Sequence, residues 1–301
     1  MKLLVLLMLL FTTVRSESSP EIRLEQDVRK LSVDFSPRSH KDLENLNATA
    51  NYILESFTKA GARVEEQAFE VDGKTYRNII AHFGEGEEPL RIVGAHYDAA
   101  EGTPGADDNA SGVAGLLELA RKLGEQAKLP AIQLVAYTLE EPPYFGGPFM
   151  GSFVHAKSLS DQKTKIEWMI SLEMIGYFTD KRKSQTYPLP GMEKQYPSKG
   201  NFIAVISKLD QTALTQKIHK QMQEGTDLPV VFFNGPERLP GVGFSDHRNY
   251  WAFGFPAVMV TNTAFMRNQE YHADGDTADR LDYKRMAKVV DGVFMVLTHT
   301  L

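Results

Sequence analysis

The stretch that decides the fold is Pro89-Leu-Arg-Ile-Val-Gly-Ala-His-Tyr-Asp98, an apolar run that ends in a polar cluster. A short apolar run of this kind is typical of a buried strand. The segment Gly105-Ala-Asp-Asp-Asn-Ala-Ser-Gly112 then leads into apolar positions at helical spacing, up to about residue 126. Asn109 or Ser111 could cap that helix. A strand, a polar loop and a helix in this order predict an α/β domain whose functional groups lie where the strand ends.

The rest of the chain continues this alternation of helices and strands. Helices are predicted over residues 41–61, with Gly61 as the C-cap, and over residues 282–297. Strands are predicted within 64–83, with a turn at Asp72-Gly73, and at 131–138, 166–172, 202–206, 230–233 and 257–260. This pattern favours a largely parallel or mixed sheet that is covered on both faces. The loop 179–200 is rich in Lys, Pro and Tyr and is the predicted insertion or lid.

Five candidate metal ligands stand in five short segments along the chain. They are His96, Asp108, Glu141, Glu173 and His272. Zinc favours histidine nitrogen and carboxylate oxygen where thiolates are absent. Two ions held about 3.5–4 Å apart need a shared ligand, and Asp108, just ahead of a helix, is the predicted bridge. We expect one ion to take Glu141 and His272, and the other to take His96 and Glu173.

Three further residues are the candidate catalytic groups. Glu140 adjoins a ligand and is the predicted general base, taking a proton from a water whose pKa two cations lower from about 15.7 to roughly 7. Asp98 stands two residues after His96 and is expected to accept the second imidazole N–H. Tyr271 stands beside His272 and is expected to donate to an oxyanion. Together these residues predict a site for two zinc ions that hydrolyses an amide bond.

Several other side chains carry weaker signals. Ser245-Asp246-His247 lies in a glycine-rich segment, and either a role beside the metal ligands or a purely structural role fits it. His155, His219 and His299 are expected to be solvated or structural. Eight aromatic residues between positions 144 and 265 could line an apolar pocket or simply fill the core. They are Tyr144, Phe145, Phe149, Phe178, Phe244, Tyr250, Trp251 and Phe265.

The composition limits the classes of protein that remain. The chain has 301 residues, of which 42% are hydrophobic and 24% charged, so a globular fold with a sizeable core is expected. The net charge is -6 and there is no basic block, which argues against nucleic acid or an anionic membrane as partner. There is no cysteine, so disulfides, thiolate metal ligands and a cysteine nucleophile are excluded.

The N-terminus has the pattern of a signal peptide. Met1-Lys2 precedes an apolar run from Leu3 to about Val14 that is too short to span a bilayer. We predict a signal peptide over residues 1–16 and a single zinc peptidase domain over 17–301. The alternative is a buried N-terminal strand or helix. The signal would export the protein, to the periplasm or the medium, with no stable membrane insertion after its removal.

Six segments together resemble the co-catalytic dizinc aminopeptidase family, whose relatives include glutamate carboxypeptidases, glutaminyl cyclases and transferrin receptors. The segments are GAHYD (94–98), PGADDNASG (104–112), LEEPPYFGGPFMGS (139–152), SLEMIGYF (171–178), FSDHRNYWAFGFPAVM (244–259) and EYHADGDT (270–277). The resemblance runs from about Asn45 to the C-terminus. It implies a three-layer α/β/α sandwich around a central mixed, mostly parallel sheet, of the phosphorylase/hydrolase-like kind.

The resemblance also assigns roles to residues. It implies metal ligands at His96, Asp108, Glu141, Glu173 and His272 and the general base at Glu140. It further implies Asp98 as the partner of His96 and a cis peptide bond between Asp108 and Asn109. The stretch 142–150 departs from the family's simplest secreted members because it is longer and richer in Pro, Gly and aromatic residues. This departure bears on the specificity pocket and leaves the metal ligands untouched.

Three functions remain open from the sequence. The first is an exported metallo-aminopeptidase that holds two Zn²⁺ ions and removes N-terminal residues from peptides with a free N-terminus. The second is a glutaminyl cyclase-like acyltransferase or a carboxypeptidase on the same scaffold. The third is a non-catalytic binding ectodomain, although the chain keeps every ligand and the base.

Overall fold

The computed structural model describes residues 18–86 and 89–299, which form α-helices, β-strands and short helical turns. The predicted signal peptide over residues 1–16 lies outside the described residues. The helices are α1 (Pro20–Arg29), α2 (Leu43–Lys59), α3 (Gly112–Gly124), α4 (Gly151–Asp161), α5 (Thr212–Gly225), α6 (His247–Ala252) and α7 (Tyr283–Thr298). The strands are β1 (Arg63–Val71), β2 (Lys74–Phe83), β3 (Leu90–His96), β4 (Ile132–Tyr137), β5 (Ile166–Glu173), β6 (Ile203–Lys208), β7 (Val230–Gly235) and β8 (Ala257–Thr261).

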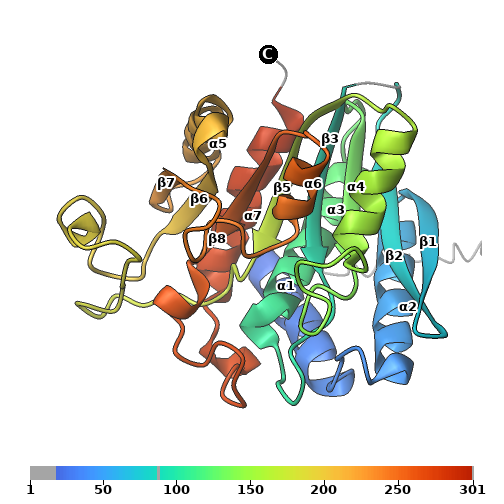
Figure 1. Ribbon diagram of the computed structural model, residues 1–301, viewed down its shortest axis with the longest axis horizontal. Coiled ribbons are helices and arrows are strands. Elements are labelled where there is room, and N and C mark those ends of the chain that lie inside the picture. The colour runs from blue at the N-terminus through green and yellow to red at the C-terminus, as the bar shows by residue number, and fades with distance from the viewer. Residues whose placement is uncertain (1–17, 87–88, 300–301) are drawn as a thin grey trace, which may run out of the picture.

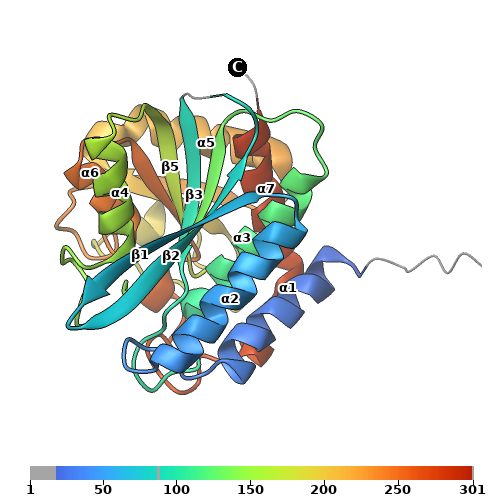
Figure 2. The same cartoon turned by 90° about the vertical axis from the view of Figure 1, so that its right-hand side faces the viewer.

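All eight strands join one mixed sheet in the order β1-β2-β4-β3-β5-β8-β6-β7. The central strands β4, β3, β5 and β8 are parallel, whereas β1, β2 and the β6–β8 pair add antiparallel ladders. Helices cover both faces, with α4 and α6 on one face and α2, α3 and α7 on the other (Figures 1 and 2). The fold is therefore the expected α/β sandwich around a mixed, mostly parallel sheet.

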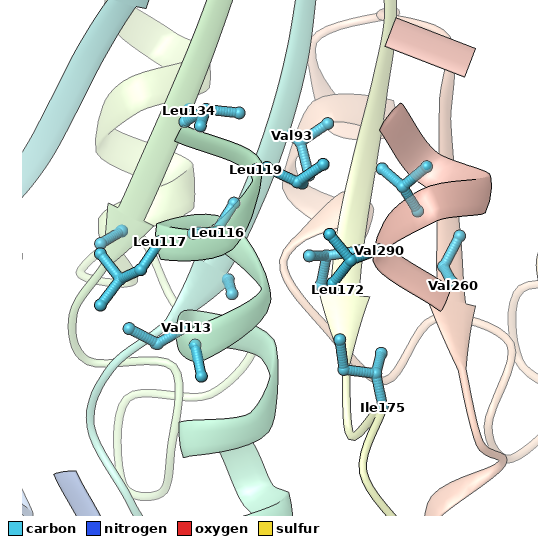
Figure 3. Close-up of a cluster of buried hydrophobic side chains, with 14 of the residues drawn as sticks. Val93, Val113, Leu116, Leu117, Leu119, Leu134, Leu172, Ile175, Val260 and Val290 are labelled. Atoms are coloured by element: carbon cyan, nitrogen blue, oxygen red, sulfur yellow. The ribbon is translucent and has the colours of Figure 1, made fainter. Parts of the chain in front are cut away.

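Alternate residues of each central strand face the two helical layers. Val93, Leu134, Leu172 and Val260 point towards α3 and α7, where they pack with residues such as Leu116 (Figure 3). Their neighbours in sequence, such as Ile92, Val135 and Met169, pack on the opposite face with α4 and α6. Strands buried on both sides are continuously apolar, which is why the sequence shows them as apolar runs without alternation.

The predicted elements of the sheet are confirmed, with boundaries within a few residues. The turn at Asp72-Gly73 joins β1 to β2, and Gly61 ends α2 with a left-handed φ of 85°. The sequence patterns gave no boundaries for α1, α4, α5 and α6. The apolar faces of α4 and α6 are blurred in the sequence, because these two helices pack on each other as well as on the sheet.

The carboxyl ends of the four central parallel strands lie at the same edge of the sheet, where the long loops gather (Figure 1). In open α/β sheets this edge carries the ligand site. Among residues 18–86 and 89–299, no helix combines the length and apolarity needed to cross a bilayer.

Candidate metal centre

The five predicted metal ligands converge at this edge of the sheet. His96 is the last residue of β3 and Glu173 the last residue of β5. Glu141 follows β4 by four residues, and Asp108 lies in the turn Ala106–Ser111 that leads into α3. His272 comes from the long loop after β8, so neither it nor Asp108 is placed directly by a strand end.

Asp108 lies between the two imidazoles. Its Oδ1 is 3.3 Å from His96 Nε2, and its Oδ2 is 3.1 Å from His272 Nε2. Each carboxylate oxygen therefore faces one histidine, which is the arrangement that a carboxylate shared by two ions requires.

The two remaining carboxylates divide between the histidines. Glu173 Oε2 lies 3.4 Å from His96 Nε2, and Glu141 Oε2 lies 3.2 Å from His272 Nε2. Three groups of ligand atoms result, each with its atoms within 4.8 Å of one another: His96–Asp108–Glu173, Asp108–Glu141–His272 and His96–Glu140–Glu141. The first two contain Asp108. The described residues thus form two adjoining candidate cation sites with Asp108 in common.

The polar atoms of the cluster fit divalent cations. His96 Nε2 and Glu141 Oε1 are buried and have no hydrogen-bond partner within the protein. Buried polar atoms without partners are costly, and coordination to a cation would satisfy them. The donor set of two imidazoles and three carboxylates, with no thiolate in the chain, suits zinc.

The electrostatics of the cluster are those of acids crowded into a buried space. Burial opposes ionisation of Asp108, but the imidazoles of His272 and His96 that face its carboxylate outweigh burial and hold the pKa of Asp108 well below its usual value. Burial together with the neighbouring Asp108 raises the pKa of Glu141 to about 7. Burial also raises the pKa of Glu173 to about 7 and that of Glu140 well above its usual value. Positive charge at the centre would lower the raised pKa values of the three glutamates.

Asp98 supports the cluster in a different way from the one expected. His96 Nδ1 lies 3.1 Å from the backbone carbonyl of Asp98 and 3.5 Å from its carboxylate. The carboxylate accepts the backbone N–H groups of Glu140 and Glu141 at 3.2 and 3.0 Å. With Nδ1–H donated to the carbonyl, Nε2 of His96 is left free for the centre. Asp98 therefore orients both the histidine and the pair of glutamates.

The two adjacent glutamates reach the same site because the backbone turns before them. Leu139 has a left-handed φ of 59°, and Glu140 then lies with its Oε2 3.9 Å from His96 Nε2. Glu141 points to His272 instead. Glu140 is 6% exposed and borders the centre without joining either three-residue group around Asp108.

The turn that carries Asp108 is held from three directions. Asp276 accepts the backbone N–H groups of Asp107 and Asp108 at 3.0 Å, and buried Arg38 donates to the carbonyls of Pro104 and Gly105. The Asp108–Asn109 peptide bond is cis, as the family resemblance implies. The Asn109 side chain donates to the carbonyl of Leu172 and accepts the N–H groups of Gly112 and Met174, so it ties the end of β5 to the start of α3.

The Ser245-Asp246-His247 segment reaches the centre through its serine. Ser245 Oγ donates to Glu173 Oε2 at 2.8 Å. His247 is buried, with its Nε2 against the carbonyl of Val242, and serves the packing around Trp251. Tyr271 stacks on His272 with ring centroids 3.8 Å apart. Ser245 and Tyr271 thus each contact a side chain of the ligand cluster.

Sequence reasoning missed the residues that hold the loops. Asp276 follows His272 by four residues within the quoted segment 270–277, so its position was visible although its role was not. Arg38 gave no signal, because its partners are four backbone carbonyls, those of Leu31, Tyr97, Pro104 and Gly105. His155 is buried and hydrogen-bonded to Tyr250 at 2.6 Å, which makes it structural.

Comparison with known proteins places the chain among metallopeptidases. The sequence profile described as peptidase family M28 matches residues 78–297. A protein of Escherichia coli, the uncharacterized protein YfbL, is 49% identical over 288 residues, which cover 93% of this chain and 88% of that protein. A probable leucine aminopeptidase of Trichophyton verrucosum is 30% identical over 292 residues, covering 89% of this chain and 71% of the relative.

Solved structures share the fold at low sequence identity. A zinc aminopeptidase from Bacillus subtilis superposes with a TM-score of 0.71 at 15% identity, covering 93% of this chain and 95% of that one. A glutaminyl cyclase from Porphyromonas gingivalis gives a TM-score of 0.67 at 22% identity, covering 91% and 96%. At these identities the likeness establishes the fold alone, which two different chemistries share.

Proposed function

Because this chain belongs to peptidase family M28, we propose that it is a zinc-dependent aminopeptidase that hydrolyses the N-terminal peptide bond of peptides. One observation carries this proposal: the Asp108 carboxylate faces His96 with one oxygen and His272 with the other, with Glu173 and Glu141 completing the two sides. Each side would hold one Zn²⁺. The probable leucine aminopeptidase among the relatives supports the same substrate class.

Different residues of the site are proposed to carry out different parts of the hydrolysis. Two zinc ions held here would lower the pKa of a water to roughly 7 and polarise the carbonyl of the scissile bond. Glu140 is the general base, since its carboxylate borders the centre and belongs to neither of the two groups that share Asp108. It takes the water proton and delivers it to the leaving amine. Tyr271, held by stacking on His272, is proposed to donate its hydroxyl hydrogen to the oxyanion.

Two recesses on either side of the centre suit the two parts of a peptide. One is an apolar recess bounded by Glu173, Met259, Phe265 and Tyr271, with about 380 Å³ of empty space, part of it open to solvent. It is proposed to take the side chain of the N-terminal residue. The other is an open hollow bounded by His272, His40, Pro142 and Glu101, which is proposed to take the leaving peptide.

Export is part of the proposal and depends on residues 1–16. A cleaved signal peptide would deliver the enzyme to the periplasm or the medium. A chain without cysteine needs no disulfide formation there, and bound zinc would add to its stability.

A panel of fluorogenic peptides tests the function. The panel contains free-amine peptides, the same peptides with a blocked amine, and peptides with N-terminal glutamine, each assayed with chelator and with zinc added back. We expect release of the N-terminal residue from free-amine peptides only, abolished by chelation and restored by zinc.

Other outcomes identify the other functions of the scaffold. Cyclisation of N-terminal glutamine in place of hydrolysis would indicate a cyclase, and hydrolysis of blocked peptides from the carboxyl end would indicate a carboxypeptidase. Absence of turnover together with retained zinc would indicate a binding protein.

A further inference from the structure

A row of residues leads from the metal centre across the sheet to its edge. Glu173 on β5 is paired in register with Thr261 on β8, Thr261 with Ala204 on β6, and Ala204 with Val231 on β7. Residues paired in this way point to the same face of a sheet, and neighbouring strands are about 4.8 Å apart. The row therefore extends roughly 14 Å from Glu173 along one face.

Two apolar chambers lie over this row. The front chamber is the recess beside the centre, bounded by Glu173, Thr261 and Tyr271. The rear chamber lies further along the row, against Ala204 and Val231, and encloses about 430 Å³ of empty space, part of it open to solvent. The chambers have four lining residues in common, Ile206, Gly241, Thr263 and Met266. The two spaces are therefore neighbours with a shared wall.

Met266 is the deformable part of the shared wall. Its terminal methyl lies against Gly241, where a Cβ would be only 3.0 Å from Met266 Cε. A methionine side chain is unbranched and adopts alternative rotamers at low cost. Ile206 by contrast lies in β6, where its branched side chain is fixed by the sheet. A change of rotamer at Met266 would thus enlarge one chamber at the expense of the other.

The loop 179–200 covers the rear chamber and is anchored to the segment around Met266. Gln185 donates to Thr263 Oγ1 at 2.8 Å, and both the N–H and the hydroxyl of Thr186 donate to the carbonyl of Met266 at 2.9 Å. Tyr187 and Met192 of the loop line the chamber. The Tyr187 hydroxyl donates a hydrogen bond to the carbonyl of Pro197. These hydrogen bonds fix the backbone at Met266, whereas the Met266 side chain has the empty space of the rear chamber behind it.

We propose that Met266 is a movable partition and that the rear chamber receives its side chain when a bulky aromatic residue occupies the front chamber. The proposal rests on the aminopeptidase function, and it assigns bulky aromatic N-terminal residues to the substrates of this enzyme. The rear chamber is lined by apolar atoms and the front chamber mainly by them, so the favoured side chains are apolar. Phenylalanine and the larger 2-naphthylalanine satisfy that condition.

Filling the rear chamber tests the partition. Val231 lies on the edge strand β7, is partly exposed and lines only the rear chamber, so Val231→Phe occupies the space meant for Met266. We expect the ratio of kcat/KM for a 2-naphthylalanine amide to that for an alanine amide to fall about tenfold or more, the size of effect that a pocket's shape can exert. Met192→Phe, in the covering loop, should act in the same direction.

Two further variants complete the test. Val33→Phe makes the same change at a site that is 61% exposed and lines neither chamber, and it should leave the ratio as in the wild type. Met266→Ala, added to Val231→Phe, removes the partition and should restore the ratio. A wild-type ratio in both Val231→Phe and Met192→Phe, with thermal unfolding showing folded proteins, would overturn the proposal.

Failure of the partition and failure of the proposed function give different results. If the wild type hydrolyses no free-amine amide, the aminopeptidase proposal fails on the alanine substrate alone. The partition is then tested by calorimetry of the zinc-loaded protein with free 2-naphthylalanine and free alanine. Tighter binding of 2-naphthylalanine that Val231→Phe abolishes would support the partition, and equal binding of both ligands by the wild type would refute it.

Discussion

Asp108 shows how much of the centre depends on one side chain. It is 4% exposed, and its two oxygens face two histidines from different parts of the chain. Those two imidazoles overcome the effect of burial and keep the pKa of Asp108 low. A carboxylate that stays ionised where its neighbours Glu140, Glu141 and Glu173 are driven towards protonation is suited to hold positive charge.

Glu140→Gln tests the proposed base. The amide keeps the size of the side chain but cannot accept a proton, so kcat should fall by about 10²–10⁴. Zinc content should stay at the wild-type value, since Glu140 lies outside both ligand groups around Asp108. Steady-state kinetics and elemental analysis measure the two quantities. Glu224→Gln on the exposed face of α5 is the matched control, and turnover of Glu140→Gln equal to that of this control would remove Glu140 from the role.

Ser245→Ala tests the hydrogen bond to Glu173. Loss of the hydroxyl removes the donor 2.8 Å from Glu173 Oε2, and loss of such an outer partner weakens metal binding by about 10–100-fold. Competition with a chromogenic chelator measures the zinc affinity. The control is Ser207→Ala, since Ser207 is equally buried in β6 but donates to the carbonyl of Ala257. Equal zinc affinity in the two variants would contradict the prediction.

Among the structural elements, the turn Ala106–Ser111 links the sheet to α3 and sets the position of Asp108. It leaves few of its polar groups to solvent, since every residue from Ala106 to Ser111 is buried. Asp276 holds its N–H groups, Arg38 holds the carbonyls just before it, and Asn109 joins it to β5. Three segments that are distant in sequence, those of Arg38, the end of β5 and Asp276, therefore fix one carboxylate.

Asp276→Ala tests this dependence. The substitution leaves the buried N–H groups of Asp107 and Asp108 without their acceptor, and an unsatisfied buried donor costs about 1–3 kcal/mol. We expect the free energy of unfolding, measured with urea, to fall by about that amount, and zinc affinity to fall with it. Asp279→Ala is the control, because Asp279 is exposed and pairs only with Arg29 on the surface. A loss of stability no greater than in this control would show that the turn does not depend on Asp276.

At the scale of the whole molecule, the sheet concentrates acidic groups at one edge, within a chain of net charge -6. Four carboxylates, from Asp108, Glu140, Glu141 and Glu173, meet there in a buried space. Their mutual repulsion works against folding unless cations or protons neutralise them. Stability should therefore depend on both metal and pH.

After removal of zinc, a rise in pH should lower the free energy of unfolding. The pKa values of Glu141 and Glu173 rise from 4.5 to about 7 on folding, so between these values the folded chain holds protons that the unfolded chain has lost. The free energy of unfolding of the chelated protein should then fall as pH rises through this window. His272, whose pKa rises from 6.5 to about 10, continues the decline. Asp108 works in the opposite sense, but its contribution is complete above pH 5.

Urea unfolding at pH 5 and pH 8, with chelator and with zinc, measures this effect. We expect the chelated protein to be less stable at pH 8 than at pH 5. Zinc at a hundred times its dissociation constant should add about 2.7 kcal/mol at pH 8. A chelated protein that is more stable at pH 8 would show that the buried carboxylates do not govern its stability.

The sequence by itself determined the sheet and which candidate ligands gather at its edge. Strands buried on both faces must be apolar, so a polar residue such as His96 or Glu173 at the end of an apolar run marks an edge of the sheet. That local rule located β3, β4, β5 and β8 and the side chains that follow them. The same rule does not reach Asp108, which was identified by its place ahead of a helix, or His272, which was identified by resemblance and by its residue type alone.

Only the tertiary structure decided how the cluster is held and what adjoins it. The contacts of Arg38 with four carbonyls, of Asp276 with two amides and of Asn109 with β5 join segments far apart in the chain, and backbone groups carry no sequence signal. The two chambers divided by Met266 likewise depend on the register of β5, β8, β6 and β7. Patterns of residue type follow from local burial, whereas pairings between distant segments follow from packing, and packing exists only in the folded chain.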